Sequence, residues 1–226
     1  MSKKFFLNLS SLFFPDPCVH CQKETVSQIE ICAFCLKDLD FTPITHNLKG
    51  LFYGKLNIEF ACSLFYFKKN TIAQKIIHAL KYQSNKKIGV EFGKLLGEKI
   101  KEQNCIGDID YIIPIPIHHK RKYNRGYNQS EYIAKGISEI INKKISLTFL
   151  IKKKNRKSQT KNSAEKRWIN TKNTFHVIKK KEIKHVLIVD DVITTGATIE
   201  DAVNTIMEGF PKIKISIVSL AVTKTD

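Results

Sequence analysis

The sequence predicts an α/β fold, with a mostly parallel sheet flanked by helices and a small cysteine-rich segment in front of it. Val186 to Val189 are four consecutive apolar β-formers, which suit a strand buried on both faces, as in a parallel sheet covered by helices. Two carboxylates, a short polar loop and a helical pattern follow this run. Near the other end, two cysteine pairs share the C-x-x-C spacing. We therefore expect a small segment over residues 1–45 and an α/β domain over residues 46–226.

Length and composition fit one domain with a small appendage. The chain has 226 residues, of which 42% are hydrophobic and 26% charged, and no apolar stretch approaches the length that spans a bilayer. The charge is less ordinary, because 38 Lys and Arg against 21 Asp and Glu leave +17. Such a charge attracts polyanions, with nucleic acid the obvious candidate. The alternative is compositional drift, since most of the excess is lysine scattered along the chain.

The first residues resemble an export signal only superficially. Met1 to Phe14 has a basic start and an apolar middle, but Asn8, Ser10 and Ser11 interrupt the apolar run. The spacing of Phe5, Leu9, Leu12 and Phe13 fits one face of a short helix instead. We expect a helix that docks on the body of the protein.

Four cysteines predict a zinc site. Cys18 and Cys21 form one C-x-x-C pair, and Cys32 and Cys35 form a second after a ten-residue gap. Four thiolates at this spacing can hold one tetrahedral zinc, which would contribute much of the folding free energy of so short a segment. Two disulfides would need an exported protein, and a thioredoxin-like site would need a single pair beside a βαβ unit. His20 could also ligate, whereas Cys62 and Cys105 are isolated thiols.

The next stretch alternates strand and helix patterns. Residues 41–57 have turn residues and indicate a connector, and Glu59 to Phe67 predicts a strand rich in aromatics. Helices are expected from Thr71 and over Lys87 to Glu102. Three glycines recur every four residues along the second helix, and they predict a groove into which another element packs closely: Gly89, Gly93 and Gly97.

A basic loop follows the next predicted strand. Asp110 to Ile117 begins as a strand, but Pro114 and Pro116 cannot donate to a central ladder, so the strand must leave the sheet near Pro114. The basic residues from His118 to Asn128 then lead into a helix with isoleucines on one face. If this strand is parallel to the one ending at Asp190, cations and acids share one edge of the sheet. Taken alone, the loop is better explained as a solvated basic turn, and the acidic loop beside it reverses this preference.

The strongest functional signal is the stretch from Asp190 to Thr198. Asp190 and Asp191 are expected at the carboxyl end of the strand, where open α/β sheets place their ligands. Thr198 opens a helical pattern with Asp201 three residues later, as in a capping box. Thr194, Thr195 and Thr198 supply hydroxyls, and Gly196 lets the backbone approach a ligand. A helix N-terminus attracts anions, so one ligand carrying both a phosphate and hydroxyls, or a hydrated Mg²⁺, fits this stretch.

Two segments remain. Lys152 to Asn173 is strongly basic with one tryptophan, Trp168, and predicts a mobile lid, a nucleic-acid contact or a solvated loop. Ile213 to Val222 is apolar enough to be a covered neighbour of the Val186 strand.

The motif V-D-D-V-I-T-T-G-A-T resembles the phosphoribosyl pyrophosphate (PRPP) motif of the type I phosphoribosyltransferases. Together with the cysteine pairs, R-G-Y-N-Q at 125–129 and the segments 154–159 and 165–170, it makes nearly the whole chain similar to the competence protein F (ComF) family. The lid departs most from the family, which usually has R-x-R-x-T-x-S-Q where this chain has Lys154, Arg156 and Lys157-Ser158-Gln159.

The resemblance implies a phosphoribosyltransferase-like domain over residues 46–226, a structural zinc, and Mg²⁺ that accompanies PRPP. It implies these roles: Asp190 and Asp191 as catalytic acids; Thr194, Thr195, Gly196, Ala197 and Thr198 for the 5′-phosphate; Arg121, Arg125 and Gly126 for pyrophosphate; and Gln159 and Arg167 in the lid. It further implies a cytoplasmic protein that handles single-stranded DNA in natural transformation. The alternative is an active phosphoribosyltransferase that transfers phosphoribose to an unidentified nitrogen acceptor in nucleotide metabolism.

Overall fold

The computed structural model describes residues 17–25, 29–44, 48–102, 109–152, 174–178 and 183–224. The predicted docking helix over residues 1–14, Cys105, Trp168 and the lid residues Gln159 and Arg167 lie outside these ranges. Among the residues that the structure describes, no helix is both long and apolar enough to cross a bilayer.

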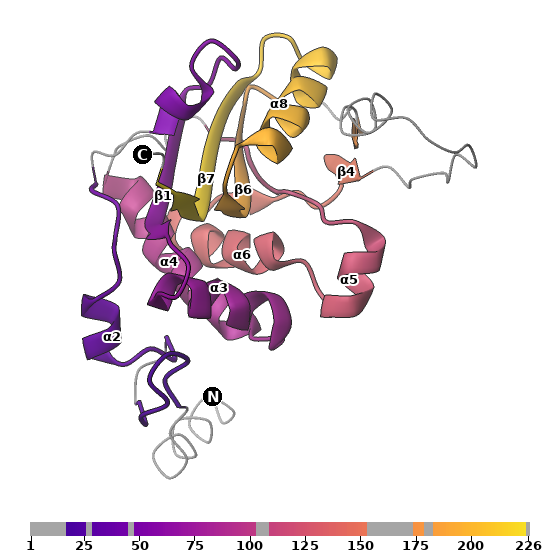
Figure 1. The fold of residues 1–226 in the computed structure, drawn as a ribbon. Coiled ribbons are helices and arrows are strands. Elements are labelled where there is room, and N and C mark those ends of the chain that lie inside the picture. Colours follow the sequence, from indigo (N-terminus) through magenta and orange to yellow (C-terminus); the bar gives the residue numbers. More distant parts are fainter. Residues whose placement is uncertain are drawn as a thin grey trace, which may run out of the picture.

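A parallel sheet forms the centre of the molecule (Figure 1). Its five strands have the spatial order β1-β7-β6-β2-β3, and every pair is parallel. The strands are β1 (Phe60–Phe67), β2 (Tyr111–Pro114), β3 (Lys144–Ile145), β6 (His185–Ile193) and β7 (Lys214–Thr223). A separate antiparallel ribbon joins β4 (Leu150–Lys152) and β5 (Phe175–Val177). The predicted parallel sheet is confirmed, including β2 and β7 on the two sides of β6.

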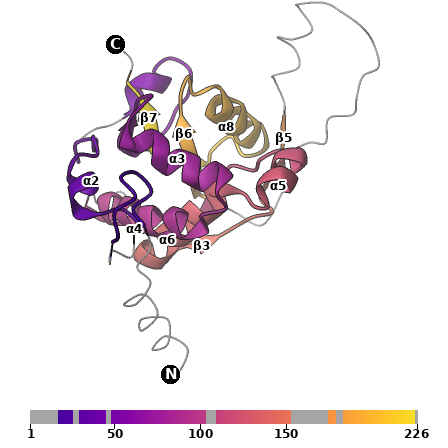
Figure 2. The same ribbon diagram turned by 60° about the horizontal axis from the view of Figure 1, so that its bottom comes forward.

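Helices cover both faces of the sheet (Figure 2). One face carries α3 (Ile72–Tyr82), α4 (Lys86–Glu102) and α6 (Gln129–Ile141), and the other carries α8 (Ala197–Gly209). Shorter helices are α2 (Ala33–Lys37), η1 (Leu48–Phe52) and α5 (His119–Arg125). The strand at the centre alternates between the two layers, since Leu187 and Val189 pack with α3, α4 and α6, whereas Val186 and Ile188 pack with α8. This two-sided burial explains the unbroken apolar run.

The glycine groove on α4 is filled by α6, as the sequence predicts. A Cβ on Gly93 would run into the carbonyl oxygen of Ile133, and a Cβ on Gly136 of α6 would run into that of Val90. The two backbones are therefore in direct contact. This crossing fixes α6, whose N-terminal end reaches the carboxyl edge of the sheet.

Three local expectations are wrong. The strand does not stop at the acids, because β6 stays paired with β7 up to Ile193 opposite Val222. The basic loop is the helix α5, which the ring of His118 caps by accepting the Lys120 N–H at 3.3 Å and which ends at Gly126 in the left-handed region (φ 74°). Lysine and arginine are good helix formers, so a basic run need not be a loop. Helix α8 begins at Ala197 behind Gly196 without a capping box, because the Asp201 carboxylate accepts hydrogen bonds from Thr174 instead.

The cysteine-rich segment is joined to the domain by the chain that follows it. Backbone hydrogen bonds pair Thr42 N with Leu64 O at 3.0 Å and Tyr66 N with Asp40 O at 2.8 Å, so residues 40–42 cover the free edge of β1. The ammonium of Lys99, only 7% exposed, donates to the carbonyls of Thr42 and Ser63 at 2.8 and 2.9 Å. Burial lowers the pKa of Lys99. Edge strand, connector and α4 are thus held together.

Candidate functional site

The carboxyl ends of β2 and β6 bring the predicted acids and cations together. The strands lie side by side with Pro114 opposite Val189, and the Ile115 N–H still donates to Val189 O at 2.9 Å. From this edge the chain continues into α5 and α6 on one side and into the loop before α8 on the other (Figure 1). Because the strands are parallel, both connections leave from the same edge, which is where such sheets bind ligands.

The two acids have different surroundings. The half-buried Asp190 carboxylate accepts hydrogen bonds from Ser130 Oγ at 3.3 Å and from the Asp191 N–H at 2.9 Å, both at Oδ1. The Asp191 carboxylate instead forms an ion pair with Lys81 Nζ of α3 at 2.8 Å. The acids are therefore held from two different helices.

Asp190 and the loop behind β6 line one small cavity. This cavity of about 30 Å³ is lined by Asp190, Val192, Ile193 and residues 194–199, and Asp191 is not among its lining residues. Gly196 has φ +80°, and a Cβ there would lie 2.9 Å from the ring of the buried Phe52. Both the backbone conformation and the ring demand glycine at this position.

Hydrogen bonds shape the loop from two sides. Thr223 Oγ1 at the end of β7 donates to Thr194 O at 3.2 Å, and Thr195 Oγ1 accepts the Ala197 N–H at 3.5 Å. The first turn of α8 presents its backbone N–H groups toward this loop, with Thr198 in that turn. Amide donors and the helix dipole both favour an anion here.

The predicted cations lie on or beside α5. Arg125 Nη1 donates to Gln129 Oε1 at 2.9 Å, and its guanidinium lies 5.3 Å from the centre of the Tyr82 ring. Gly126 ends α5, and no atom lies within 4 Å of a Cβ built there, so its role in the structure is the left-handed turn. Arg121 is exposed.

Lys152, at the end of β4, completes the positive side of the site. Burial and the charge of Arg121 lower the pKa of Lys152, and the carboxylates of Asp201 and Asp190 oppose this. The charges of Arg121, Asp201 and Asp190 therefore act on Lys152. On the return strand, Thr174 N donates to Asp201 Oδ2 at 3.1 Å. The β4–β5 ribbon, which flanks the predicted lid, is thus attached to α8.

Burial and the neighbouring charge of Asp191 raise the pKa of Asp190 to about 7. The Asp191 N–H, the Lys81 charge and the Ser130 hydroxyl act in the opposite direction without cancelling the effect. A carboxyl group with such a pKa is divided between its neutral and charged forms near neutral pH, which is typical of functional sites.

The four predicted zinc ligands form a cluster away from the sheet edge. All four sulfur atoms lie within 4.8 Å of one another, and Cys21 Sγ is 3.7 Å from Cys32 Sγ. Tetrahedral zinc with Zn–S bonds of about 2.3 Å requires a spacing of about 3.8 Å, so the cluster could bind a metal such as zinc. His20 Nδ1 lies 3.3 Å from Cys35 Sγ, which suits a hydrogen bond to a ligand sulfur.

The thiols of this cluster are unequal. Burial acts to raise the pKa of Cys18, but hydrogen bonds from the backbone N–H groups of Cys21, Cys32 and His20 outweigh it and lower the pKa to about 6. Burial and the neighbouring cysteines raise the pKa of Cys35. N–H donors around one sulfur favour the thiolate, which is the form that binds a metal.

Sequence reasoning missed Lys81, Ser130 and Thr223 and did not foresee that the charge of Asp190 acts on Lys152. These side chains belong to α3, α6, β7 and β4, and they reach the site only through the tertiary fold. No local motif marks Lys81. A lysine at the end of the apolar face of a helix is only weak evidence that its side chain reaches a functional site.

Comparisons with known proteins show what this chain is similar to. A family model described as the phosphoribosyl transferase domain matches residues 128–225, which include both acids and the loop. Competence protein F of Haemophilus influenzae is 31% identical over 133 residues, 56% of this chain and 58% of that protein. DNA utilization protein YhgH of Escherichia coli O6:H1 is 28% identical over 129 residues, 56% of this chain and 57% of that protein. The matched part thus spans a little over half the length of these relatives.

The solved structure of orotate phosphoribosyltransferase from Aeropyrum pernix matches 77% of this chain and 90% of that chain, with 12% sequence identity and a TM-score of 0.35. The parallel sheet flanked by helices and the match over residues 128–225 show a phosphoribosyltransferase-like fold. Within the matched part, the chain is similar to Competence protein F and to DNA utilization protein YhgH.

Proposed function

We propose that the chain binds PRPP at the carboxyl edge of its sheet. The observation that carries this proposal is the cavity that Asp190 shares with the loop over residues 194–198. A ligand there must present a phosphate to the backbone N–H groups of the helix start and hydroxyls to a carboxylate. A sugar phosphate has both groups on one small molecule, and the nearby cations suit a second, pyrophosphate group.

In this proposal each predicted group has a physical task. The loop from Thr194 to Thr198 holds the 5′-phosphate, and Asp190 accepts hydrogen bonds from ribose hydroxyls. Arg121 and Arg125, together with Lys152, offset the charge of the pyrophosphate. Asp191 forms the ion pair with Lys81 beside Asp190. Mg²⁺ would arrive with PRPP and neutralise part of the pyrophosphate.

Calorimetric titration of the purified protein with PRPP, with and without Mg²⁺, tests the proposal. Asp190→Asn should weaken binding by roughly tenfold or more, because hydrogen bonds to a charged acceptor are worth about 1.5–3 kcal/mol. Glu98→Gln, which removes an exposed acid on α4, is the matched control and should bind like the wild type. Wild-type protein that shows no binding at millimolar PRPP, or Asp190→Asn that binds unchanged, would contradict the proposal.

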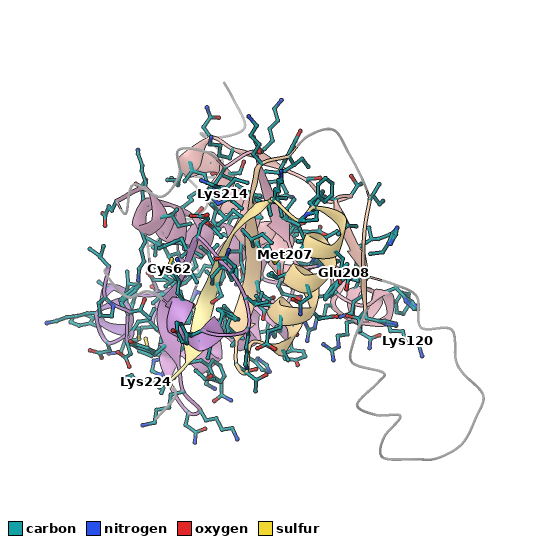
Figure 3. The ribbon with its side chains drawn as sticks, turned by 90° about the horizontal axis from the view of Figure 1, so that it is seen from above. Cys62, Lys120, Met207, Glu208, Lys214 and Lys224 are labelled. Atoms are coloured by element: carbon teal, nitrogen blue, oxygen red, sulfur yellow. The ribbon has the colours of Figure 1, made fainter. Side chains whose placement is uncertain are left out.

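We further propose that single-stranded DNA is the macromolecular partner and that it contacts α5. This helix presents Lys120 and Arg121 to solvent together with Tyr123, which is 89% exposed (Figure 3 shows Lys120 at the periphery). Tyr82, 64% exposed, lies under Arg125 at the same place. Cations for the phosphates and an aromatic ring for the bases are the elements of single-strand binding. The overall charge of +17 and the relative named a DNA utilization protein point the same way.

Fluorescence anisotropy with a labelled oligothymidylate at several salt concentrations tests this partner. Lys120→Gln/Tyr123→Ala should weaken binding by roughly tenfold, since stacking on one base is worth about 1–3 kcal/mol, and should reduce the salt dependence. Lys214→Gln/Tyr53→Ala is the matched control, because both residues are exposed and Lys214 lies elsewhere on the surface (Figure 3). Equal losses in both variants, or binding insensitive to salt, would exclude α5 as the contact. Release of pyrophosphate in the presence of an acceptor would instead favour a phosphoribosyltransferase.

A further inference from the structure

The ion pair between Lys81 and Asp191 places a cation inside the acidic part of the site. Lys81 Nζ lies 2.8 Å from Asp191 Oδ1, and the side chains are only 21% and 12% exposed. A carboxylate at this burial is costly without a partner, whereas a nearby opposite charge offsets the cost. Lys81 lies on α3, far from the acids in sequence.

The two neighbours of Lys81 on α3 are held by the R-G-Y-N-Q segment. The hydroxyl of the buried Tyr127 donates a hydrogen bond to Leu80 O, and the Arg125 guanidinium lies over the Tyr82 ring. Burial raises the pKa of Tyr127 to about 12, so its hydroxyl remains a donor. The last turn of α3 is therefore held in place on both sides of Lys81. This fixes the backbone from which the lysine side chain reaches Asp191.

The acids consequently face different partners. Asp190 lines the cavity with the phosphate loop, whereas Asp191 faces α3 and does not line that cavity. PRPP carries several negative charges, and a second carboxylate without a counter-charge would repel it. Resting on the proposed binding of PRPP, we propose that Lys81 is a positioning residue that serves as the internal counter-ion of Asp191, so that Asp190 is the acid of the pair that contacts the sugar.

If the two acids were equivalent, Asp190→Asn and Asp191→Asn would weaken PRPP binding equally. The division of roles predicts that they differ. Asp191→Asn removes a negative charge that does not touch the ligand, so PRPP should bind it at least as tightly as the wild type, within about threefold. Lys81→Met leaves Asp191 without its partner and should weaken PRPP binding by roughly tenfold, while Lys81→Arg should retain most of the affinity. Asp190→Asn should lose affinity whatever occupies position 191.

A double-mutant cycle gives the decisive measurement. If Lys81 acts through Asp191, Lys81→Met/Asp191→Asn should recover PRPP affinity to within about threefold of Asp191→Asn alone. Calorimetric titrations with PRPP and Mg²⁺ would be made well below the thermal unfolding midpoint of each variant, which circular dichroism measures. Lys75→Met, an exposed lysine on the same helix, is the matched control and should bind like the wild type.

The outcomes separate this inference from the proposed function. Wild-type protein that does not bind PRPP overturns both. Wild-type protein that binds, with Lys81→Met no weaker than Lys75→Met, overturns the counter-ion role alone. The same holds if Asp191→Asn loses affinity as strongly as Asp190→Asn, or if the double variant shows the summed losses of its single variants.

Discussion

Asp190 is the residue whose chemistry depends most on its surroundings. Burial raises the pKa of its carboxyl group and the negative charge of Asp191 adds to the effect, so the pKa of about 7 lies well above the ordinary value of 3.8. The group can therefore accept and donate hydrogen bonds near neutral pH, which suits a partner that carries hydroxyls. The same property makes Asp190 a weak point in the stability of the ligand-free protein.

We predict that Asp190→Asn stabilises the ligand-free protein at alkaline pH. Between about pH 4 and pH 7, native Asp190 holds a proton that the unfolded chain has lost, so rising pH favours the unfolded state. Asparagine does not titrate and can still accept from Ser130 and from the Asp191 N–H. The free energy of unfolding of Asp190→Asn should exceed that of the wild type by about 1–2 kcal/mol at pH 8 and by little at pH 4. Urea denaturation across this range measures the difference.

Asp110, near the opposite end of the sheet, provides a control of opposite sign. Burial acts to raise the pKa of Asp110, but the N–H groups of Lys184 and His185, at 2.7 and 3.0 Å, outweigh it and lower the pKa. Its contribution to stability is present above the unfolded pKa and is lost as pH falls through the folded pKa. Asp110→Asn should therefore lower the free energy of unfolding at neutral pH, and the difference from the wild type should shrink in acid. Parallel pH curves for Asp190→Asn and the wild type would refute the account of Asp190.

At the scale of secondary-structure elements, the local sequence pattern predicted the elements whose pattern has a single physical cause. The apolar run of β6, the prolines that end β2 and the glycines of α4 each have one physical explanation, and the structure confirms all three. Element ends were harder. Helix α5 and the extension of β6 to Ile193 depend on a histidine cap and on pairing with β7, and neither is visible in the residues themselves.

The charged contacts of the site could not be predicted for a related reason. Sequence identifies Asp190 and Asp191 because they occur in a motif, but Lys81 reaches Asp191 only after α3 packs against the sheet. Asp201 likewise looks like a capping residue until the β4–β5 ribbon brings Thr174 to it. Interaction partners that are far apart in the chain leave no periodic signal in the sequence, so only the three-dimensional structure identifies them.

The crossing of α4 and α6 yields a prediction at this scale. Gly136→Ala should destabilise the domain by about 3 kcal/mol or more, because its Cβ would collide with the Val90 backbone, which cannot move without shifting α4. Gly97→Ala should cost less, since its Cβ would lie 2.8 Å from the Ile140 Cβ, a smaller overlap than that with Val90 O at Gly136. Thermal unfolding followed by circular dichroism gives both values. Similar losses for the two variants would mean that the helices do not touch through their backbones.

At the scale of the whole molecule, the four-cysteine cluster is not an independent appendage. Cys18, Ile31, Cys35 and Leu39 belong to the same apolar core as β1, α3 and α4. Glu30 forms an ion pair with Lys87 at 3.4 Å and accepts a hydrogen bond from Asn85, both close to the start of α4. The domain boundary at residue 45 therefore remains a prediction from the sequence. Residues on both sides of it pack in one core.

This shared core predicts that metal and domain unfold together. If the cluster holds zinc, the purified protein should contain one zinc per chain by plasma mass spectrometry, and Cys21→Ser should lower this content. The same substitution should lower the thermal midpoint of the whole domain by roughly 5–10 °C, because loss of the metal loosens the core residues that support β1 and α4. Cys62→Ala, in β1 and apart from the cluster, is the control and should keep its zinc. Two separate transitions, with the later one unchanged by a chelator, would instead show that the sheet is stable without the cysteine segment.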